Sequence, residues 1–214
     1  MWVIYFSIKL PTVIFAHSKI IDIMKKLLLA SLMASMLAAP ALQAAEYEID
    51  TQGAHAFVQF KISHLGYSWL YGRFNTFKGN FSYDAAKLAD SKIQLEIDTK
   101  SVDSNHAERD KHLRSPDFLN VDKNSKATFV STKIVPKAGA DFDVVGNFTL
   151  NGVTKEIVIK ATKLGEGSDP WGGYRAGFAG TTSINLEDFA IKNILGPASA
   201  TVQLDLSVEG IKKS

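Results

Sequence analysis

Strict alternation of apolar and polar residues is the clearest pattern along the chain. It runs through residues 92–98 (KIQLEID) and again through residues 202–208 (VQLDLSV). Because successive side chains of a strand point to opposite faces, this alternation predicts strands with one buried and one solvent-facing side. Antiparallel sheets and barrels have this arrangement, whereas parallel sheets are buried on both faces.

A tight hairpin is predicted at Asn151-Gly152, which lies between two such runs at 142–150 and 153–159. Asn-Gly favours a type I′ turn because both residues accept a positive φ. Further strands are predicted near residues 47–51, 54–64, 70–83, 126–135, 156–164 and 172–185. About eight strands in one run suit an antiparallel barrel, which closes on itself and leaves no exposed edge.

One stretch, residues 104–120, is polar and does not alternate. Ser104 or Asn105 is suited to cap a short helix that continues through Leu113, and Ser115-Pro116 is expected to end it. The fold class that we predict is therefore all-β, an antiparallel β-barrel of about eight strands with one or two short helices.

Residues 24–44 have the order of a secretory signal peptide, with Met24-Lys25-Lys26, an apolar run over 27–39 and small residues after it. The apolar run is shorter than the roughly 20 residues that a membrane-spanning helix needs. We expect cleavage after Ala44 and export to a bacterial periplasm, with Ala41 and Ala45 as alternative cleavage sites.

Residues 1–23 are interpreted as an extension upstream of a biological start at Met24, although residues 1–44 could act as an anchor if the extension is made. After them, no repeat or linker divides the chain, and residues 45–214 are predicted to form one domain.

Charge and cysteine content exclude several classes of function. The chain has 24 basic and 22 acidic residues, and residues 1–44 contribute four of the former and one of the latter, which leaves 20 against 21. A near-neutral body lacks the basic stripe that a nucleic-acid partner requires. The absence of cysteine excludes disulfides, thiolate metal sites and a cysteine nucleophile.

Catalytic and metal-binding motifs are also missing. His55, His64, His106 and His112 form no H-x-x-x-H or H-E-x-x-H pair, and neither G-x-S-x-G nor a phosphate-binding glycine loop occurs. We therefore predict no metal, no cofactor and no catalytic residues. His55 and His64 are interpreted as hydrogen-bonded residues at an end of the barrel.

Phenylalanine is frequent, and the side chains either fill an ordinary core or line an elongated apolar cavity. The residues concerned are Phe57, Phe60, Phe74, Phe77, Phe81, Phe118, Phe129, Phe142, Phe148, Phe178 and Phe189. A barrel of about eight strands is just wide enough to hold side chains or one small ligand.

Residues 106–114 form a dense cluster of mixed charge. One interpretation is a solvated helix face with local ion pairs. The alternative is a polar rim at a cavity mouth, where Arg109, Lys111 and Arg114 hold a phosphate-like head group and His112 donates to it.

Four stretches of the sequence resemble the YceI-like family of bacterial periplasmic lipid-binding proteins. They are 49–64 (IDTQGAHAFVQFKISH) with the segments 72–74 and 77–79, residues 102–129 with RDKHLRSPDFLNVDKNSKATF, residues 146–159 (GNFTLNGVTKEIVI) and residues 177–189 (GFAGTTSINLEDF). The resemblance spans essentially all of 46–210. It implies an extended lipocalin-like barrel that holds a polyisoprenoid amphiphile, of the quinone or polyprenyl phosphate type, for transport, storage or sensing.

Inward-facing strand positions are the predicted lipid-binding residues. They are Phe60, Ile62, Leu95, Ile97, Phe129, Phe148, Ile159, Phe178, Leu204 and Leu206. Three alternatives stay open: an enzyme that acts on lipid inside the barrel with Asp110 and His112 as acid and base, an integral outer-membrane barrel, and an immunoglobulin-type sandwich. The charged end of the chain at 209–214 disfavours the second, and a homodimer is compatible with the sequence.

Overall fold

The computed structural model of the protein describes residues 44–192 and 195–213. The predicted extension at 1–23 and the predicted signal peptide, apart from Ala44, lie outside the described residues. No helix in the described part of the chain is long and apolar enough to cross a membrane.

The described residues form an antiparallel sheet of eleven strands. The strands are β1 (Ala45–Ile49), β2 (Phe57–His64), β3 (Ser68–Phe74), β4 (Phe77–Tyr83), β5 (Lys92–Asp98), β6 (Val102–Asp103), β7 (Lys126–Pro136), β8 (Asp141–Leu150), β9 (Val153–Ser168), β10 (Tyr174–Asn185) and β11 (Thr201–Lys212). The helices are α2 (Ala107–Arg114) and the 3-10 helices η1 (Ala85–Asp90), η2 (Thr99–Ser101), η3 (Glu187–Phe189) and η4 (Pro197–Ser199).

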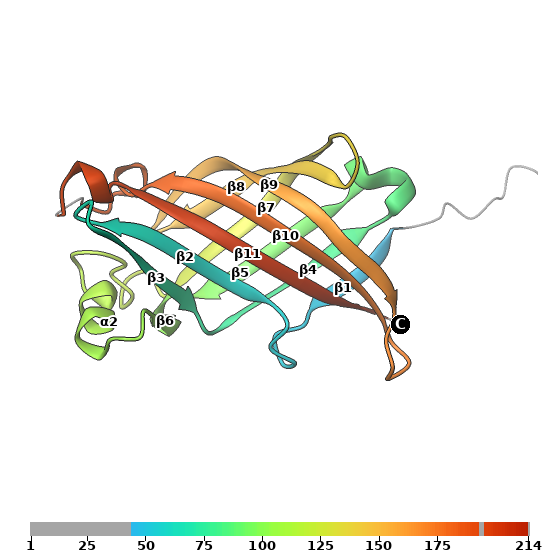
Figure 1. Ribbon diagram of the computed structural model, residues 1–214, viewed down its shortest axis with the longest axis horizontal. Helices are drawn as coiled ribbons and strands as arrows, with labels where there is room; N and C mark the ends of the chain where they lie inside the picture. The colour runs from blue at the N-terminus through green and yellow to red at the C-terminus, as the bar shows by residue number, and fades with distance from the viewer. Residues whose placement is uncertain (1–43, 193–194, 214) are drawn as a thin grey trace, which may run out of the picture. The chain divides into compact units, whose positions relative to one another are not determined.

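The sheet closes into a barrel with eight positions, because three positions are each shared by two strands. β11 pairs with β2 along its first half and with β1 at its end, so β1 and β2 together make one interrupted position. β4 and β3 make the next position, and β5 and β6 make the third. The other five strands are neighbours in chain order (Figure 1). The predicted all-β antiparallel barrel with short helices is confirmed.

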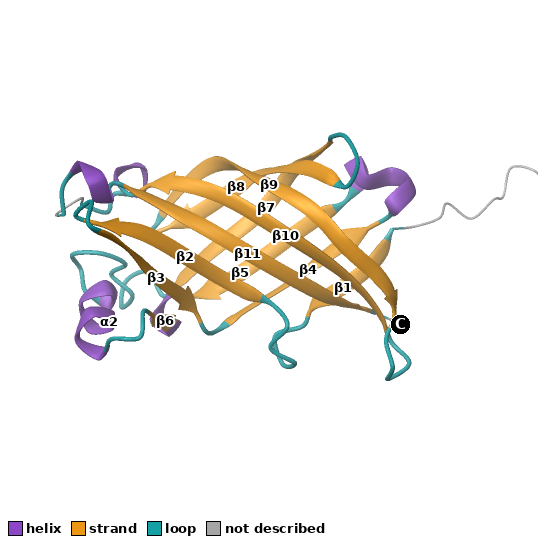
Figure 2. Cartoon of the chain, viewed as in Figure 1, coloured by secondary structure: helices purple, strands orange, loops and turns teal. Residues whose placement is uncertain are grey.

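The barrel wall is incomplete at one end. β6 pairs with β3 only at Arg73 and Phe74, and the chain then leaves the sheet to form α2. The edge of β3 from Ser68 to Gly72 therefore has no further strand beside it in the part of the chain that the structure describes. Helices lie at both ends of the barrel, with α2 and η4 at this end and η1 at the opposite one (Figure 2).

Two local predictions differ from the structure. The strand expected at 70–83 is broken at Asn75 and Thr76, whose N–H groups donate to the carbonyl and hydroxyl oxygens of Ser101 instead of continuing a ladder. The helix begins at Ala107, and its cap is His106, whose Nδ1 accepts the Arg109 N–H at 3.3 Å. The caps proposed at Ser104 and Asn105 are thus wrong.

The predicted hairpin is present between β8 and β9. Asn151 and Gly152 both have positive φ, +49° and +77°, as a type I′ turn requires. The Asn151 side chain also donates to the carbonyl of Phe189 and accepts from Asn124. The turn is therefore tied to the end of η3 and to the loop between α2 and β7.

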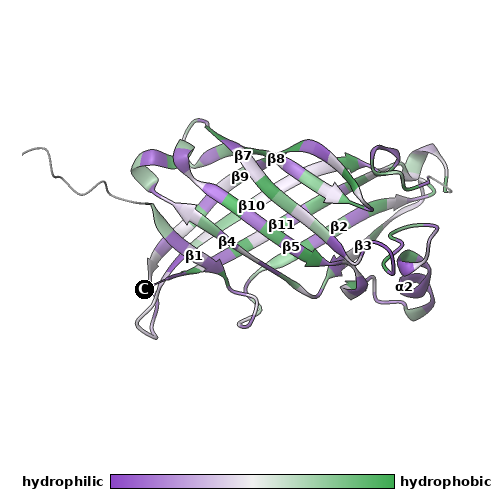
Figure 3. Cartoon of the chain, turned by 180° about the vertical axis from the view of Figure 1, so that it is seen from behind, coloured by the Kyte–Doolittle hydropathy of each residue, from purple (hydrophilic) through white to green (hydrophobic). Residues whose placement is uncertain are grey.

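Apolar and polar residues alternate along the strands (Figure 3). The apolar side chains form the buried core inside the barrel. Where β1 joins β4 the interior is filled by aromatic rings. Tyr47 and Phe81 stack with centroids 4.8 Å apart, and Phe178 meets Phe81 edge-on at 5.4 Å. Between this packed end and α2 the interior is hollow.

Candidate functional site

An apolar cavity of about 390 Å³ lies inside the barrel. This volume falls within the range of small-molecule sites, about 300–1,000 Å³. Every predicted lipid-binding residue lines the cavity: Phe60, Ile62, Leu95, Ile97, Phe129, Phe148, Ile159, Phe178, Leu204 and Leu206. The register explains this, because these positions are the inward half of each strand's alternation.

Phenylalanine supplies much of the lining. Of the phenylalanines singled out in the sequence, all but Phe57 and Phe189 face the cavity. Phe57 points outward and is 38% exposed, whereas Phe189 is buried against Phe148 outside the lining. The two interpretations of the phenylalanines therefore both hold, since the same rings form the core and surround a space.

Glycines next to two of these rings make room for them. Gly72 pairs with Phe60 across β2 and β3, and a Cβ on Gly72 would clash with the Phe60 ring. A Cβ on Gly146 would meet the Phe129 ring and, at 2.6 Å, the carbonyl oxygen of Val130. These glycines allow the rings to lie against the barrel wall, which keeps the centre open.

The mouth of the cavity is at the end that carries α2. Among the lining residues that the structure describes, only His64, His112 and Leu195 are also exposed to solvent. They come from the end of β2, from α2 and from the loop before η4, which lie at the same end of the barrel (Figure 1). The lining thus reaches the surface beside the gap in the wall.

Two of the four predicted head-group residues, Arg109 and His112, line the cavity at this mouth. Lys111 is exposed and Arg114 is half-buried, and neither lies on the lining. The Arg114 guanidinium instead donates to the carbonyl oxygens of Lys100 and Val102, each at 2.8 Å. Arg114 therefore ties α2 to the strand that precedes it.

Arg109 is held by a short hydrogen-bond network. Its Nε donates to the Ser104 hydroxyl at 2.7 Å and its second terminal nitrogen donates to the Ser104 carbonyl at 2.5 Å. The buried Asp110 carboxylate accepts from both the N–H and the hydroxyl of Ser104. These contacts engage two nitrogens of the guanidinium and leave the third, Nη1, outside the network.

The acid–base pair of the enzyme hypothesis is not assembled. Asp110 is bonded to Ser104, and the Nε2 atom of His112 lies 3.3 Å from Asp117. In the described residues, Asp110 and His112 share no hydrogen bond.

Sequence reasoning missed two features of the lining. Ser91, which follows η1 at the end opposite α2, faces the cavity, and its Oγ is the only buried side-chain polar atom in the described residues without a partner. Nothing local in the sequence marks it. His64, interpreted as a hydrogen-bonded barrel-end residue, instead lines the mouth, and its place two residues after Ile62 on an inward-facing row was the available signal.

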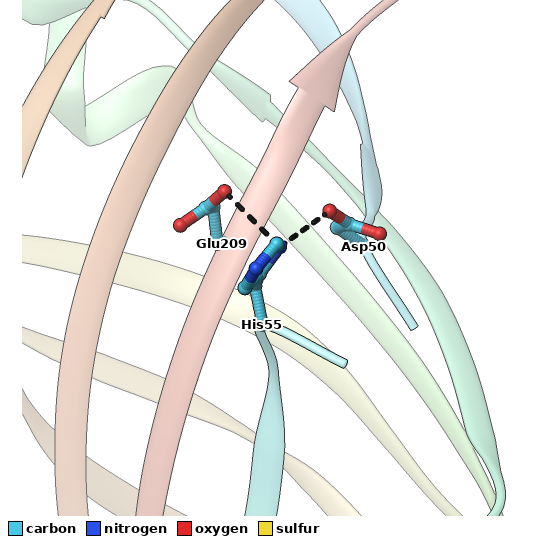
Figure 4. Close-up of side chains that lie close together, drawn as sticks. All are labelled: Asp50, His55 and Glu209. Carbon is cyan, nitrogen blue, oxygen red and sulfur yellow. Dashed lines mark hydrogen bonds and ion pairs between the residues drawn. The ribbon is translucent and has the colours of Figure 1, made fainter. Parts of the chain in front are cut away.

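A second cluster of polar side chains lies where β1, β10 and β11 meet. The Asp50 carboxylate, Nδ1 of His55 and the Glu209 carboxylate come together there (Figure 4), with His55 3.0 Å from Asp50 and 3.8 Å from Glu209. This grouping has the donor types of a metal site.

The cation at this cluster is supplied by the protein itself. Arg175 donates to Asp50 at 2.6 Å, to Glu209 at 2.5 Å and to Asp169 at 2.8 Å. The hydrogen bond from Arg175, supported by one from His55, lowers the pKa of Asp50 to about 2. The guanidinium contacts the same carboxylate oxygens that a metal would use. We call the cluster of Asp50, His55, Asp169, Arg175 and Glu209 the clasp, because it joins β10 and β11 to the segment that follows β1.

Comparisons with known proteins agree with this architecture. The sequence matches the YceI-like domain over residues 47–210. A UPF0312 protein of Shewanella denitrificans is 61% identical over 191 residues, which is 89% of this chain and 100% of that protein.

Solved structures show the same fold. The YCEI protein of Campylobacter jejuni is similar with a TM-score of 0.63 and 28% identity, over 72% of this chain and 91% of that one. A polyisoprenoid binding domain from Saccharophagus degradans is similar with a TM-score of 0.57 and 18% identity, over 79% and 99% of the two chains. The match across the barrel and the identity with whole relatives lead to one conclusion: the chain belongs to the YceI-like family.

Proposed function

We propose that the protein binds a long polyisoprenoid amphiphile in its barrel cavity and serves in the transport, storage or sensing of that lipid. The observation that carries the proposal is the apolar cavity itself, which extends from the aromatic packing near Phe178 to a mouth beside α2. The polyisoprenoid binding domain with the same fold supports this choice of ligand.

Burial of the tail supplies the affinity. Removing apolar surface from water contributes about 25 cal/mol per Å², or about 0.8 kcal/mol for each methylene group. Ordering a flexible chain opposes this gain. The lining offers almost no polar atoms that a hydrocarbon would have to desolvate, so the balance favours a saturated or prenyl chain over a polar ligand.

In this proposal the head group lies at the mouth, where Arg109 and His112 line the cavity. The fixed guanidinium of Arg109 can donate from Nη1 to an oxygen of a phosphate or quinone, and the exposed imidazole of His112 can add a second donor. Lys111 and Arg114 are left out of this site, because they do not face the cavity.

A series of isoprenoids with increasing chain length tests the proposal. The delipidated protein is titrated with prenyl phosphates of two to eleven units, and linear alkyl phosphates of equal carbon number serve as controls. Burial of the five carbons of one prenyl unit, at about 0.8 kcal/mol for each methylene group, exceeds the about 1.4 kcal/mol that corresponds to a tenfold change in affinity. We therefore expect the dissociation constant to fall about tenfold or more with each added unit, until the cavity is full. An affinity that does not depend on chain length would contradict tail burial.

We further propose that the barrel, residues 45–214, acts in the periplasm after cleavage of the signal peptide at residues 24–44. The signal-like order of residues 24–44 supports this. Fractionation of the bacterial host and N-terminal sequencing of the exported protein test it. A chain recovered with an intact N-terminus from the cytoplasm would contradict the proposal.

A further inference from the structure

The outer face of the β2–β3 hairpin carries three exposed aromatic side chains. Tyr67 is 86% exposed, Trp69 51% and Tyr71 63%. Trp69 and Tyr71 occupy alternate positions of β3 and therefore point to the same side of the sheet, and Tyr67 lies in the turn directly before this strand. Leu65, in the turn of the same hairpin, is 45% exposed and extends the apolar surface to the tip.

These rings contribute little to the core. The inward residues of the hairpin, Phe60, Ile62 and Leu70, line the cavity on the opposite face. Along β3 from Ser68 to Gly72 no strand covers the outer edge in the described part of the chain. A contiguous exposed aromatic surface of this kind marks a contact site more often than a structural need.

The two strands that carry the rings hold basic residues and no acidic ones. Lys61 pairs with Tyr71 across the hairpin, and its ammonium group lies 5.3 Å from the centre of the Trp69 ring. Arg73 is the other charged residue of the two strands, and it lies 3.8 Å from Asp103 of β6. The sequence has no acidic residue between Asp50 and Asp84.

The aromatic face adjoins the mouth of the cavity. His64 and Leu195, both exposed, line the mouth beside the tip of this hairpin, and Ser199 of η4 holds the tip by accepting from the Leu65 N–H and donating to the Ser63 carbonyl. Whatever contacts the aromatic face is therefore next to the opening through which a ligand would pass.

We propose that the outer face of the β2–β3 hairpin, with Tyr67, Trp69 and Tyr71 as anchors and Lys61 as the cation, docks the protein onto an anionic phospholipid bilayer. Tyrosine and tryptophan favour the membrane–water interface because each ring has an apolar body and a polar edge. Lysine near the surface is attracted to anionic head groups.

Charge favours a bilayer over a second copy of the chain. A symmetric pairing through this face would bring the two Lys61 side chains toward each other, and the strands β2 and β3 hold no carboxylate to separate them. The acidic residues on the neighbouring strands form no ion pair with Lys61 in the described residues, because Asp205 of β11 lies beside Gln59 and Asp103 pairs with Arg73. An anionic surface meets the same cation without this repulsion.

Vesicle flotation of the exported protein, purified from its bacterial host after cleavage of the signal peptide, tests the proposal, with phosphatidylethanolamine–phosphatidylglycerol vesicles compared with phosphatidylcholine vesicles. The test variant combines Tyr67→Ser, Trp69→Ser and Tyr71→Ser. The matched control is Trp171→Ser, because Trp171 is also exposed (77%) and also has a cation, Arg175, over its ring, but belongs to the β9–β10 hairpin. Circular dichroism verifies that each variant is folded.

We expect the wild type and the Trp171→Ser variant to float with the anionic vesicles and the triple variant to bind at least tenfold less. Lys61→Glu should remove the preference for phosphatidylglycerol. Equal flotation of the triple variant and the wild type would overturn the proposal, as would equal loss in the control. If light scattering shows that the wild type is a dimer and the triple variant a monomer, the face would instead be assigned to self-association.

The docking surface does not depend on which ligand the cavity holds. Isoprenoid content is therefore measured on the same samples. A triple variant that no longer binds vesicles but still holds isoprenoid would support the docking face as a feature separate from the cavity. A wild-type protein that binds vesicles but takes up no isoprenoid would contradict the proposed carrier function and leave the docking proposal intact.

Discussion

The Arg175 guanidinium donates to the Asp50 carboxylate at 2.6 Å and so joins β10 to the segment between β1 and β2. That segment is where one barrel position changes from β1 to β2 along β11. Asp50 is 6% exposed, and its backbone N–H also donates to the carbonyl of Glu209. The clasp thus holds the chain at the point where β2 takes the place of β1 beside β11.

Asp50→Asn should destabilise the protein by about 2 kcal/mol. Removing one partner of a buried ion pair costs about 3–5 kcal/mol when the other charge is left alone, but Arg175 keeps Asp169 and Glu209. Urea unfolding measures the effect. Lys137→Ala is the control, because it removes the surface pair with Asp143 at 2.9 Å and should change stability by less than about 0.5 kcal/mol. Equal effects of the two variants would argue against the clasp.

Stability should also fall in acid through the same carboxylate. The pKa of Asp50 is about 2 in the folded protein, below its value of 3.8 in the absence of structure. A lowered pKa stabilises the fold above the unfolded value, and this contribution of about 2 kcal/mol is lost as the pH falls from about 4 through about 2. Unfolding free energies measured across this interval should show the loss in the wild type and a smaller slope in Asp50→Asn. Identical slopes would contradict the assignment.

Gly146→Ala should close part of the cavity. The new Cβ clashes with the Phe129 ring and with the Val130 carbonyl, and the ring is the group that can move. We expect a loss of about 1–3 kcal/mol in stability from overpacking together with weaker isoprenoid binding. Gly165→Ala is the matched control, since its Cβ would meet nothing within 4 Å. Unchanged binding in a folded Gly146→Ala protein would show that the ring does not enter the cavity.

Phe178→Asp should abolish lipid retention. The Phe178 ring lies 5.3 Å from Tyr83, 5.4 Å from Phe81 and 6.0 Å from Phe142, so a carboxylate there would face an apolar space. Phe148→Asp should act in the same way. Val158→Asp on the outer face of β9 is the control, because Val158 is 46% exposed. Retention of isoprenoid by a folded Phe178→Asp protein would count against the cavity as the binding site.

Period-two alternation made the lining predictable. Inward positions such as Ile97 and Leu204 follow from their own strands, without knowledge of which strands pair. The Asn151-Gly152 turn was predictable for the same reason, because its φ preferences are local.

Features that depend on distant parts of the chain were not predictable. The clasp joins Asp50 and Arg175, which are 125 residues apart in sequence. The break at Asn75 and Thr76 depends on Ser101, and no glycine or proline marks it. The division of the four head-group candidates depends on how α2 packs, since consecutive turns of one short helix place Arg109 and His112 on the cavity and Arg114 on backbone carbonyls.

Mass spectrometry of the lipid that co-purifies with the protein tests the central proposal most directly. The exported protein is purified under native conditions from the periplasm of its bacterial host, extracted with solvent and compared with Phe178→Asp and Val158→Asp prepared in the same way. We expect about one isoprenoid per protein in the wild type and in Val158→Asp, and none in Phe178→Asp. A wild-type protein that carries no isoprenoid and takes up none when it is added would contradict the proposed function.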